Sequence, residues 1–189
     1  MPMNAPPDIA SLSLAQIASL AAEAKLPPVA HWNPTHCGDS EMRIARDGTW
    51  FHQGSPIGRQ EMVRLFSTIL RREPDGGFVL VTPVEKLDIA VEDAPFLAVE
   101  LRSEGAGEAR ELAFRLNTGD LVMADDDHPI ILRQDDDGPR PYLAVRDGLE
   151  ALIVRSVYYE MVNLALEEPQ EGTPALWSRG ARFPLAPAA

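Results

Sequence analysis

Apolar residues recur along the chain with two different periods, and the period predicts the type of each secondary-structure element. A period near 3.6 predicts helices over residues 11–25, 59–72 and 155–166. Alternation of apolar and polar residues, or short apolar runs between turn signals, predicts strands. The expected strands cover residues 42–45, 49–52, 78–82, 85–91, 96–102, 111–116, 121–124, 130–133, 142–145 and 149–154.

Capping and breaking residues delimit the first two helices. Asp8 or Ser11 is a candidate cap for the first helix, and Pro27-Pro28 ends it. Ser55 is a candidate cap for the second helix, with Pro56 in its first turn. We expect the first helix to pack on the first domain as a lid.

The stretch that contains the second expected helix has a weaker copy near the C-terminus. In both copies an Arg-Asp-Gly turn precedes a strand and a helix, and a Glu-Pro pair follows the helix. This repeat predicts a duplication and an α+β fold, with two related small domains of antiparallel strands that each carry a packing helix. The matching pairs are Arg46-Asp47-Gly48 with Arg146-Asp147-Gly148, Glu61-Met62-Val63 with Glu160-Met161-Val162, Leu65 with Leu164, and Glu73-Pro74 with Glu168-Pro169.

The expected division of the chain has four parts. Residues 1–29 form an N-terminal tail and helix, and residues 30–92 form the first α+β domain. Residues 93–168 form the second domain, and residues 169–189 form a C-terminal tail. The closely spaced short strands of the second domain favour a small barrel or sandwich.

Composition narrows the choice of partners. The chain carries a net charge of −12 and has a pI of about 4.7, whereas a general nucleic-acid binder needs a basic surface. We therefore expect neither nucleic acid nor membrane as a partner. No apolar run approaches the ~20 residues that span a bilayer, no signal-peptide pattern is present, and Cys37 is the only cysteine. These features predict a cytoplasmic protein.

Two groups of potential metal ligands are weak candidates. His31, His36 and Cys37 share one loop, but His36 and Cys37 are adjacent and would point apart in an extended chain. A buried structural cysteine is the preferred interpretation of Cys37. The acidic run that ends at Gly138 fails the calcium-loop pattern, because Arg133 would occupy the first ligand position. We therefore expect no metal.

A series of short motifs runs through the chain: Trp32-x-Pro34-x-x-Cys37-Gly38, Met42-x-Ile44, Asp47-Gly48-x-Trp50, Pro56-Ile57-x-Arg59, Leu65-Phe66-Ser67, Val81-Thr82-Pro83-x-Glu85-Lys86, Asp93-Ala94-Pro95-Phe96, His128-Pro129, Pro141-Tyr142-x-x-Val145-Arg146 and Arg155-x-x-Tyr158-Tyr159-Glu160. In combination they resemble a bacterial family, the domain-of-unknown-function family numbered twelve eighty-five. The resemblance covers roughly residues 30–168. It implies a duplicated core whose C-terminal half is similar to a pleckstrin-homology fold. It also implies a role in signalling, with a nucleotide-like ligand between the halves, and it brings no catalytic residues.

The strongest residue-level prediction is a polar cleft between the two domains. Arg59 and Arg155 occupy corresponding first turns of two expected helices, where free N–H groups and the helix dipole favour an anion. The alternative is that these arginines pair with nearby glutamates and hold the halves together. The expected ligand-binding residues are Arg59, Thr82, Glu85, Lys86, Arg146, Arg155 and Tyr158.

The expected function is binding of a small anionic, nucleotide-like ligand by a sensor or signalling adaptor. The sequence contains no phosphate-binding loop, dinucleotide fingerprint, zincin pair or nucleophile elbow. We therefore do not expect an enzyme, and the cofactor is unknown. Two alternatives stay open: a protein-interaction module without a small-molecule ligand, and an enzyme whose residues meet only in space.

Overall fold

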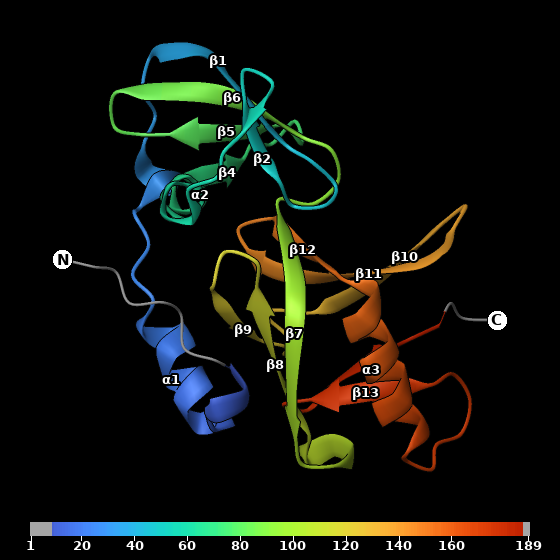
Figure 1. Cartoon of the computed structure of the whole chain (residues 1–189). Helices are drawn as coiled ribbons and strands as arrows, with labels where there is room; N and C mark the ends of the chain where they lie inside the picture. Colours follow the sequence, from blue (N-terminus) through green and yellow to red (C-terminus); the bar gives the residue numbers. More distant parts are fainter. Residues whose placement is uncertain (1–8, 187–189) are drawn as a thin grey trace.

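The computed structural model describes residues 9–186, which form two domains stacked one above the other (Figure 1). The N-terminal helix lies beside the lower, C-terminal domain (Figure 1). Within the described residues, no helix is long and apolar enough to cross a membrane. The helices are η1 (Ile9–Ser11), α1 (Leu14–Glu23), η2 (Val29–His31), α2 (Gln60–Thr68), η3 (Gly107–Ala109) and α3 (Arg155–Leu166).

The N-terminal domain is one curled sheet with α2 packed against it. The sheet order is β3-β2-β1-β6-β5-β4, and the central pair β1 and β6 is parallel while its other neighbours are antiparallel. Trp50, which is 1% exposed, stacks on Phe66 of α2 and fills the space between helix and sheet. The strands are β1 (His36–Ile44), β2 (Trp50–His52), β3 (Ser55–Pro56), β4 (Leu70–Arg72), β5 (Phe78–Val81) and β6 (Glu85–Val91).

The C-terminal domain has the same strand connectivity. Its sheet order is β10-β11-β12-β7-β8-β9, again with its first and last strands, β7 and β12, paired in parallel at the centre. α3 closes the domain and buries Val157, Met161 and Ala165, which recur every four residues on one face. The strands are β7 (Phe96–Glu104), β8 (Glu111–Leu116), β9 (Leu121–Met123), β10 (Ile130–Asp135), β11 (Gly138–Arg146) and β12 (Leu149–Ile153).

These features confirm the expected fold class of two similar α+β domains, with a curled C-terminal sheet consistent with a pleckstrin-homology-like half-barrel. The helix occupies a different position in each domain. α2 lies between the third and fourth strands of its sheet, whereas α3 follows the sixth strand. The repeated Arg-Asp-Gly turn therefore joins β1 to β2 in one domain and β11 to β12 in the other.

The predicted bounds of the helices are only partly correct. The helix over residues 155–166 is confirmed, but α1 begins at Leu14 because Ser13 and Gln16 form a capping box, and Asp8 lies outside the described residues. The helix predicted over 59–72 starts where expected, with Arg59 as its N-cap residue, but it ends at Thr68, and Ser55 and Pro56 do not belong to its start. Ser55 and Pro56 pair with β2, and the chain from Leu70 pairs with β5 instead of continuing as helix.

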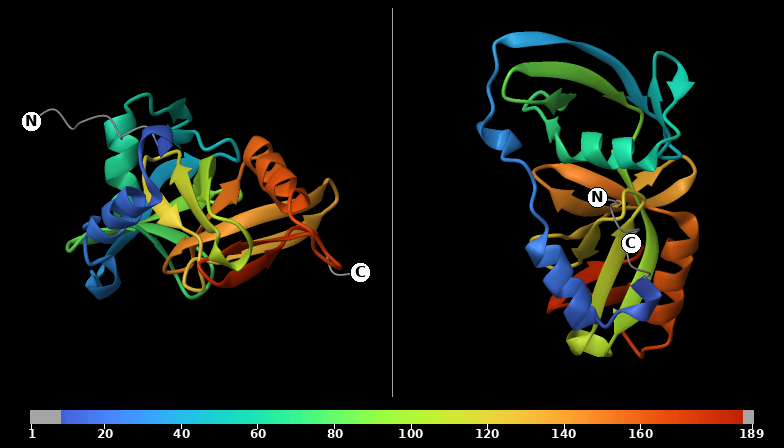
Figure 2. Two further views of the ribbon diagram at one scale, coloured as in Figure 1. Left: turned by 90° about the horizontal axis from the view of Figure 1, so that it is seen from below. Right: turned by 60° about the vertical axis from the view of Figure 1, so that its left-hand side comes forward.

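The expected lid on the first domain is also wrong. α1 packs on β8 and β9 of the C-terminal domain, where Leu14 and Ile17 are buried against Ala113 and Met123. The reason is that β9 is an edge strand whose apolar side chains need cover. The segment between α1 and the N-terminal domain is long enough to let the helix reach that edge (Figure 2).

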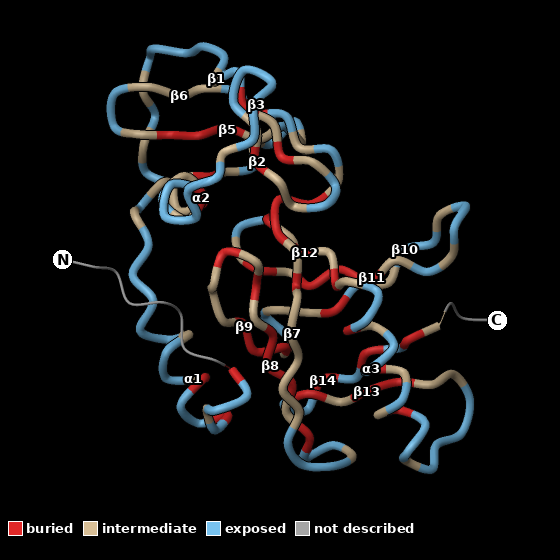
Figure 3. The backbone as a smooth tube through the Cα atoms, in the orientation of Figure 1, coloured by how far each residue is buried: buried red, intermediate tan, exposed pale blue. Residues whose placement is uncertain are grey.

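Cys37 is exposed rather than buried, which corrects the expected structural cysteine. β1 begins at His36, and its first four residues are exposed because they extend past the core along β6. Only its end, at Met42 and Ile44, is buried (Figure 3).

The segment expected as a C-terminal tail forms a hairpin, β13 (Ala175–Ser178) and β14 (Ala181–Pro184). Leu176 and Phe183 belong to the main hydrophobic core. The fully buried Ser178 hydroxyl accepts a hydrogen bond from the Leu112 N–H at 2.9 Å and donates one to the Ala124 carbonyl at 2.6 Å. The hairpin is therefore an integral layer of the C-terminal domain.

Candidate functional site

The two repeated turns meet the opposite domain at the junction. Gly148 of the second turn accepts a hydrogen bond through its carbonyl from the Arg72 guanidinium, at 3.1 Å. Gly48 of the first turn lies so close to Asn117 and Leu97 that a Cβ there would be 2.8 and 2.9 Å from their side chains. The duplicated motif thus supplies reciprocal contacts that hold the domains together.

Replacing Gly48 with alanine is expected to lower the free energy of unfolding by about 1–3 kcal/mol, since its φ is +84° and Asn117 is held by a bond from the Leu97 N–H. Gly54→Ala is the matched control, because its φ is +79° and nothing lies within 4 Å of the added carbon. Urea denaturation followed by circular dichroism measures both variants. Equal losses would show that the junction does not constrain Gly48.

One face of α2 meets the C-terminal domain, as Figure 2 shows from the side. The Gln60 amide donates to the Asn117 carbonyl at 3.0 Å, and the Ser67 carbonyl accepts from the Arg146 guanidinium at 2.8 Å. Arg64 lies between them at helical spacing, so it belongs to the same face. It is half-buried, and its Nε is buried without a hydrogen-bond partner among the described residues.

A cavity of about 580 Å³ opens beside this junction, between α1 and the C-terminal domain. One wall is formed by α1 and the segment after it, and the other by β9 and the turn before it. Arg146 lines the cavity and also reaches α2, so the cavity extends to the boundary between the domains. Its volume falls within the range of roughly 300–1,000 Å³ typical of ligand sites.

Arg146 is the most unusual charge in the cavity. Burial lowers the pKa of its guanidinium, and the nearby carboxylates of Asp120 and Asp147 offset this lowering only in part. Neither carboxylate lies within ion-pair distance of it, although its guanidinium carbon stands 5.1 Å from the centre of the Phe96 ring. A desolvated cation without a paired anion favours an anionic ligand.

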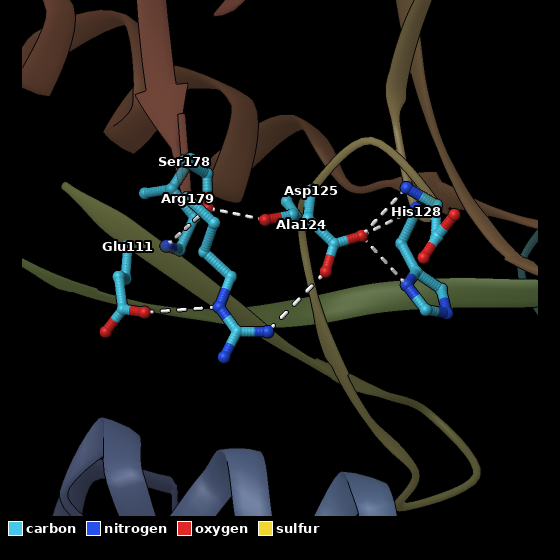
Figure 4. Close-up of polar contacts among 8 residues, drawn as sticks. Glu111, Ala124, Asp125, His128, Ser178 and Arg179 are labelled. Carbon is cyan, nitrogen blue, oxygen red and sulfur yellow. Dashed lines mark hydrogen bonds and ion pairs between the residues drawn. The ribbon is translucent and has the colours of Figure 1, made fainter. Parts of the chain in front are cut away.

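A second group of charged residues lines the cavity. Arg179 bridges Glu111 at 3.1 Å and Asp125 at 3.5 Å, and Asp125 also contacts the His128 ring at 3.1 Å (Figure 4). Burial would raise the pKa of Asp125, but the hydrogen bonds from His128 and Asp127 lower it. These charges satisfy one another, which leaves Arg146 as the cation of the cavity that lacks an ion pair among the described residues.

Two of the predicted ligand-binding residues line a second cavity, of about 470 Å³, at the start of α3. Arg155 is exposed there, and the Tyr158 hydroxyl donates to the Leu185 carbonyl at 2.5 Å. The same cavity is lined by Arg140, which is neutralised by Asp135 at 3.0 Å and by Asp93 at 2.7 Å. All of its lining residues belong to the C-terminal domain.

The other predicted residues lie outside both cavities. Arg59 is the exposed N-cap residue of α2, next to the junction. The Thr82 hydroxyl accepts a hydrogen bond from the Glu85 N–H at 3.2 Å and thereby shapes the turn between β5 and β6. Lys86 pairs with Glu73 at 3.2 Å. The structure therefore divides the seven predicted residues among separate places instead of gathering them in one cleft.

Three residues of the junction and cavity were not among the predicted ligand-binding set: Arg64, Asp120 and Arg179. The helical spacing of Gln60, Arg64 and Ser67 marks one polar stripe, but nothing in the sequence shows that this stripe faces another domain. The position of α1 decides the cavity, and that position depends on contacts across the whole chain.

Comparisons with known proteins agree with this architecture. Residues 27–94 match the family model described as "Domain of unknown function (DUF1285), N-terminal domain", and residues 95–185 match "Protein of unknown function (DUF1285), C-terminal domain". A crystal structure of a DUF1285 family protein from Silicibacter pomeroyi DSS-3 is similar, with 49% identity, a TM-score of 0.79, and coverage of 92% of this chain and 93% of that chain. A DUF1285 family protein from Shewanella baltica OS155 has 30% identity and a TM-score of 0.52, over 65% of this chain and 90% of that chain. The comparison with curated proteins found no match.

Proposed function

Because the chain belongs to the DUF1285 family, whose name records no function, we propose from the geometry that it binds a small anionic ligand at the junction of its two domains. The observation that carries the proposal is Arg146, a half-buried cation that lines a cavity and has no ion-pair partner among the described residues. Arg64 adds a second half-buried guanidinium on the α2 face that meets the same boundary.

The proposal describes a non-catalytic cytoplasmic protein with a sensory or adaptor role. A ligand that touches Arg146 would act on the bond between this residue and Ser67 of the other domain, and would thereby couple binding to the contact between the domains. The lone Cys37 fits a reducing compartment, because no second cysteine is present to form a disulfide.

A thermal-shift titration of the full chain with inorganic phosphate, AMP and decanoate tests the proposal. At least one of these anions should raise the melting temperature of the wild-type protein, since it binds the native state. Arg146→Gln should weaken binding at least about tenfold, because it removes a charged donor. Asp120→Asn should tighten binding, because it removes a competing negative charge but can still accept the bond from Thr118, which is 2.7 Å long.

Controls separate this site from the one predicted at the helix starts. The double variant Arg59→Ala with Arg155→Ala should bind as the wild type does, whereas loss of binding would move the site to those residues. Arg146→Lys keeps the charge and shows whether loss of the bond to Ser67 alone unfolds the protein. Unchanged binding by a folded Arg146→Gln variant would refute the assignment.

A protein-interaction module is the second candidate, and α3 provides the observation that favours it. Tyr159 and Leu166 lie seven residues apart on one helical face and are 57% and 67% exposed. Exposed apolar side chains on one face are typical of docking surfaces. If no tested anion binds, a partner that co-purifies with the wild type but not with a Tyr159→Ser, Leu166→Ser variant would support this function.

A further inference from the structure

The cavity beside Arg146 is apolar along most of its length. α1 contributes Ala18, Ala21 and Ala22, while Leu20 and Leu26 line its solvent edge, each 41% exposed. The opposite wall is strand β9, which is rich in apolar side chains. The space exists because α1 presents alanines where larger side chains would fill it.

The charged side chains that line this cavity are Asp120, Asp125, His128, Arg146 and Arg179, and none of them belongs to α1. Alanine and leucine side chains carry no donor or acceptor, so the α1 wall cannot recognise the polar edges of a nucleobase or a sugar through side chains. The charges of Arg179, Asp125 and His128 satisfy one another. Arg146 also lines the cavity, and its charge has no ion pair among the described residues.

We propose that the ligand is an amphipathic anion, with its charged head at Arg146 and a hydrocarbon tail between α1 and β9. This inference rests on the proposed function, because it uses the same arginine for the head group. It changes the chemical class of the ligand from nucleotide-like to acyl-like. A carboxylate and a phosphate ester can both serve as the head, since a guanidinium binds either through two parallel N–H donors.

A tail in this position would lie next to the contact between α1 and β9. Elsewhere the helix is held by a small separate core, in which Leu14 and Ile17 are 2% and 0% exposed. Ala18 packs against that core, and beyond it Ala21 is half-buried and Ala22 is exposed. A hydrocarbon tail would extend the core along the helix and remove the apolar edge from water.

The test is a calorimetric titration of the full chain with butanoate, hexanoate, octanoate, decanoate, decyl phosphate and AMP. Affinity for the carboxylates should rise about fourfold with each added methylene until the cavity is filled. Ala21→Phe should weaken decanoate binding at least tenfold, because the ring occupies the space of the tail. Ala15→Phe is the matched control on the same helix, since Ala15 is exposed and lies outside this cavity, and it should leave binding unchanged.

The outcomes separate this inference from the proposed function. Binding of AMP that depends on Arg146, without binding of decanoate, would overturn the amphipathic class and leave the proposed function intact. The inference would also be overturned if the affinity for the carboxylates did not depend on their chain length. The same holds if a folded Ala21→Phe variant bound decanoate as tightly as the wild type. Absence of binding by every anion would overturn both the amphipathic class and the proposed function.

If Ala21→Phe does not fold, the chain-length series measured on the wild type still decides whether the ligand has a hydrocarbon tail. The head group is then identified by which of the two ligands, decanoate or decyl phosphate, binds more tightly.

Discussion

Replacing Trp50 with alanine is expected to lower the free energy of unfolding by about 3–5 kcal/mol, the range for large aromatic residues removed from a core. Trp50 is 1% exposed, and its ring centroid lies 6.5 Å from that of Phe66, nearly parallel to it. Loss of the indole would leave a cavity between α2 and its sheet. Because native domains are stable by only about 5–15 kcal/mol, this change removes a large share of the total. Urea denaturation followed by circular dichroism at 222 nm measures the loss without relying on tryptophan fluorescence.

Two further variants test the reason for this loss. Trp50→Phe should cost less, about 1–2 kcal/mol, because it keeps most of the ring and removes a buried indole N–H that has no partner among the described residues. Phe51→Ala removes the next aromatic residue, which points to the other face of the strand and lies under the Arg43 guanidinium at 4.3 Å. Its expected cost is about 0.5–1 kcal/mol. A Phe51→Ala variant as unstable as Trp50→Ala would contradict the placement of the core on one face.

The sequence alone was sufficient to predict the helices and turns whose residue pattern is local. The α3 helix was predicted with its observed bounds from the apolar face of Val157, Met161 and Leu164, of which Val157 and Met161 are buried and Leu164 packs against the core. The repeated Asp-Gly turns could be predicted because few residues other than glycine adopt the positive φ values of Gly48 and Gly148, +84° and +77°. The sequence repeat predicted two related domains, although its turns and helices occupy different positions in the two sheets.

The errors arose where two patterns compete. The chain from Ile69 to Arg72 continues the apolar period of α2, yet Leu70 pairs with Leu80 of β5 because a strand at this edge buries it, with 1% exposure. The C-terminal hairpin has a local signal in the sequence: residues 175–178 and 181–184 flank Arg179-Gly180, a turn with φ of +51° and +86°. The first case shows tertiary contacts deciding between local alternatives, whereas the hairpin agrees with its local turn signal.

The anion site stays a prediction, and the structure changes which residues are its best candidates. A junction anion site involving Arg146 followed from the sequence as a prediction, but Arg59 and Arg155 were given the central role because both lie at helix starts. The structure favours Arg146 over Arg155 as the residue that binds the anion. Arg155 is exposed to water at its helix start, whereas the guanidinium of Arg146 is desolvated. The α1 wall of the cavity could not be predicted, because α1 packs on the C-terminal domain, which is distant from it in the sequence.

Replacing Glu168 with alanine is expected to lower the free energy of unfolding by about 3 kcal/mol, because it leaves a buried guanidinium without its anion. The Arg110 side chain is 7% exposed and pairs with Glu168 at 2.6 Å, and the same carboxylate oxygen accepts the Gly107 N–H at 2.9 Å. The backbone carbonyl of Arg110 also accepts the Arg179 N–H at 3.0 Å, which ties the C-terminal hairpin to this pair. Glu167→Ala is the matched control, since Glu167 is exposed and should cost less than about 0.5 kcal/mol.

The contribution of the Glu168–Arg110 pair to the free energy of unfolding depends on pH. The hydrogen bond from the Gly107 N–H, and then the one from Arg110, lower the pKa of Glu168 below its ordinary value of 4.5. A carboxyl whose pKa is lowered in the folded state binds fewer protons there than in the unfolded chain. It therefore stabilises the fold above pH 4.5 and loses this contribution as the pH falls through its lowered pKa. The difference in unfolding free energy between the wild type and Glu168→Ala should therefore be constant from pH 8 to about pH 5 and should narrow below it. A difference that stays constant down to pH 3 would show that the ionised carboxylate is not what holds Arg110, and that Glu168 acts only by filling space.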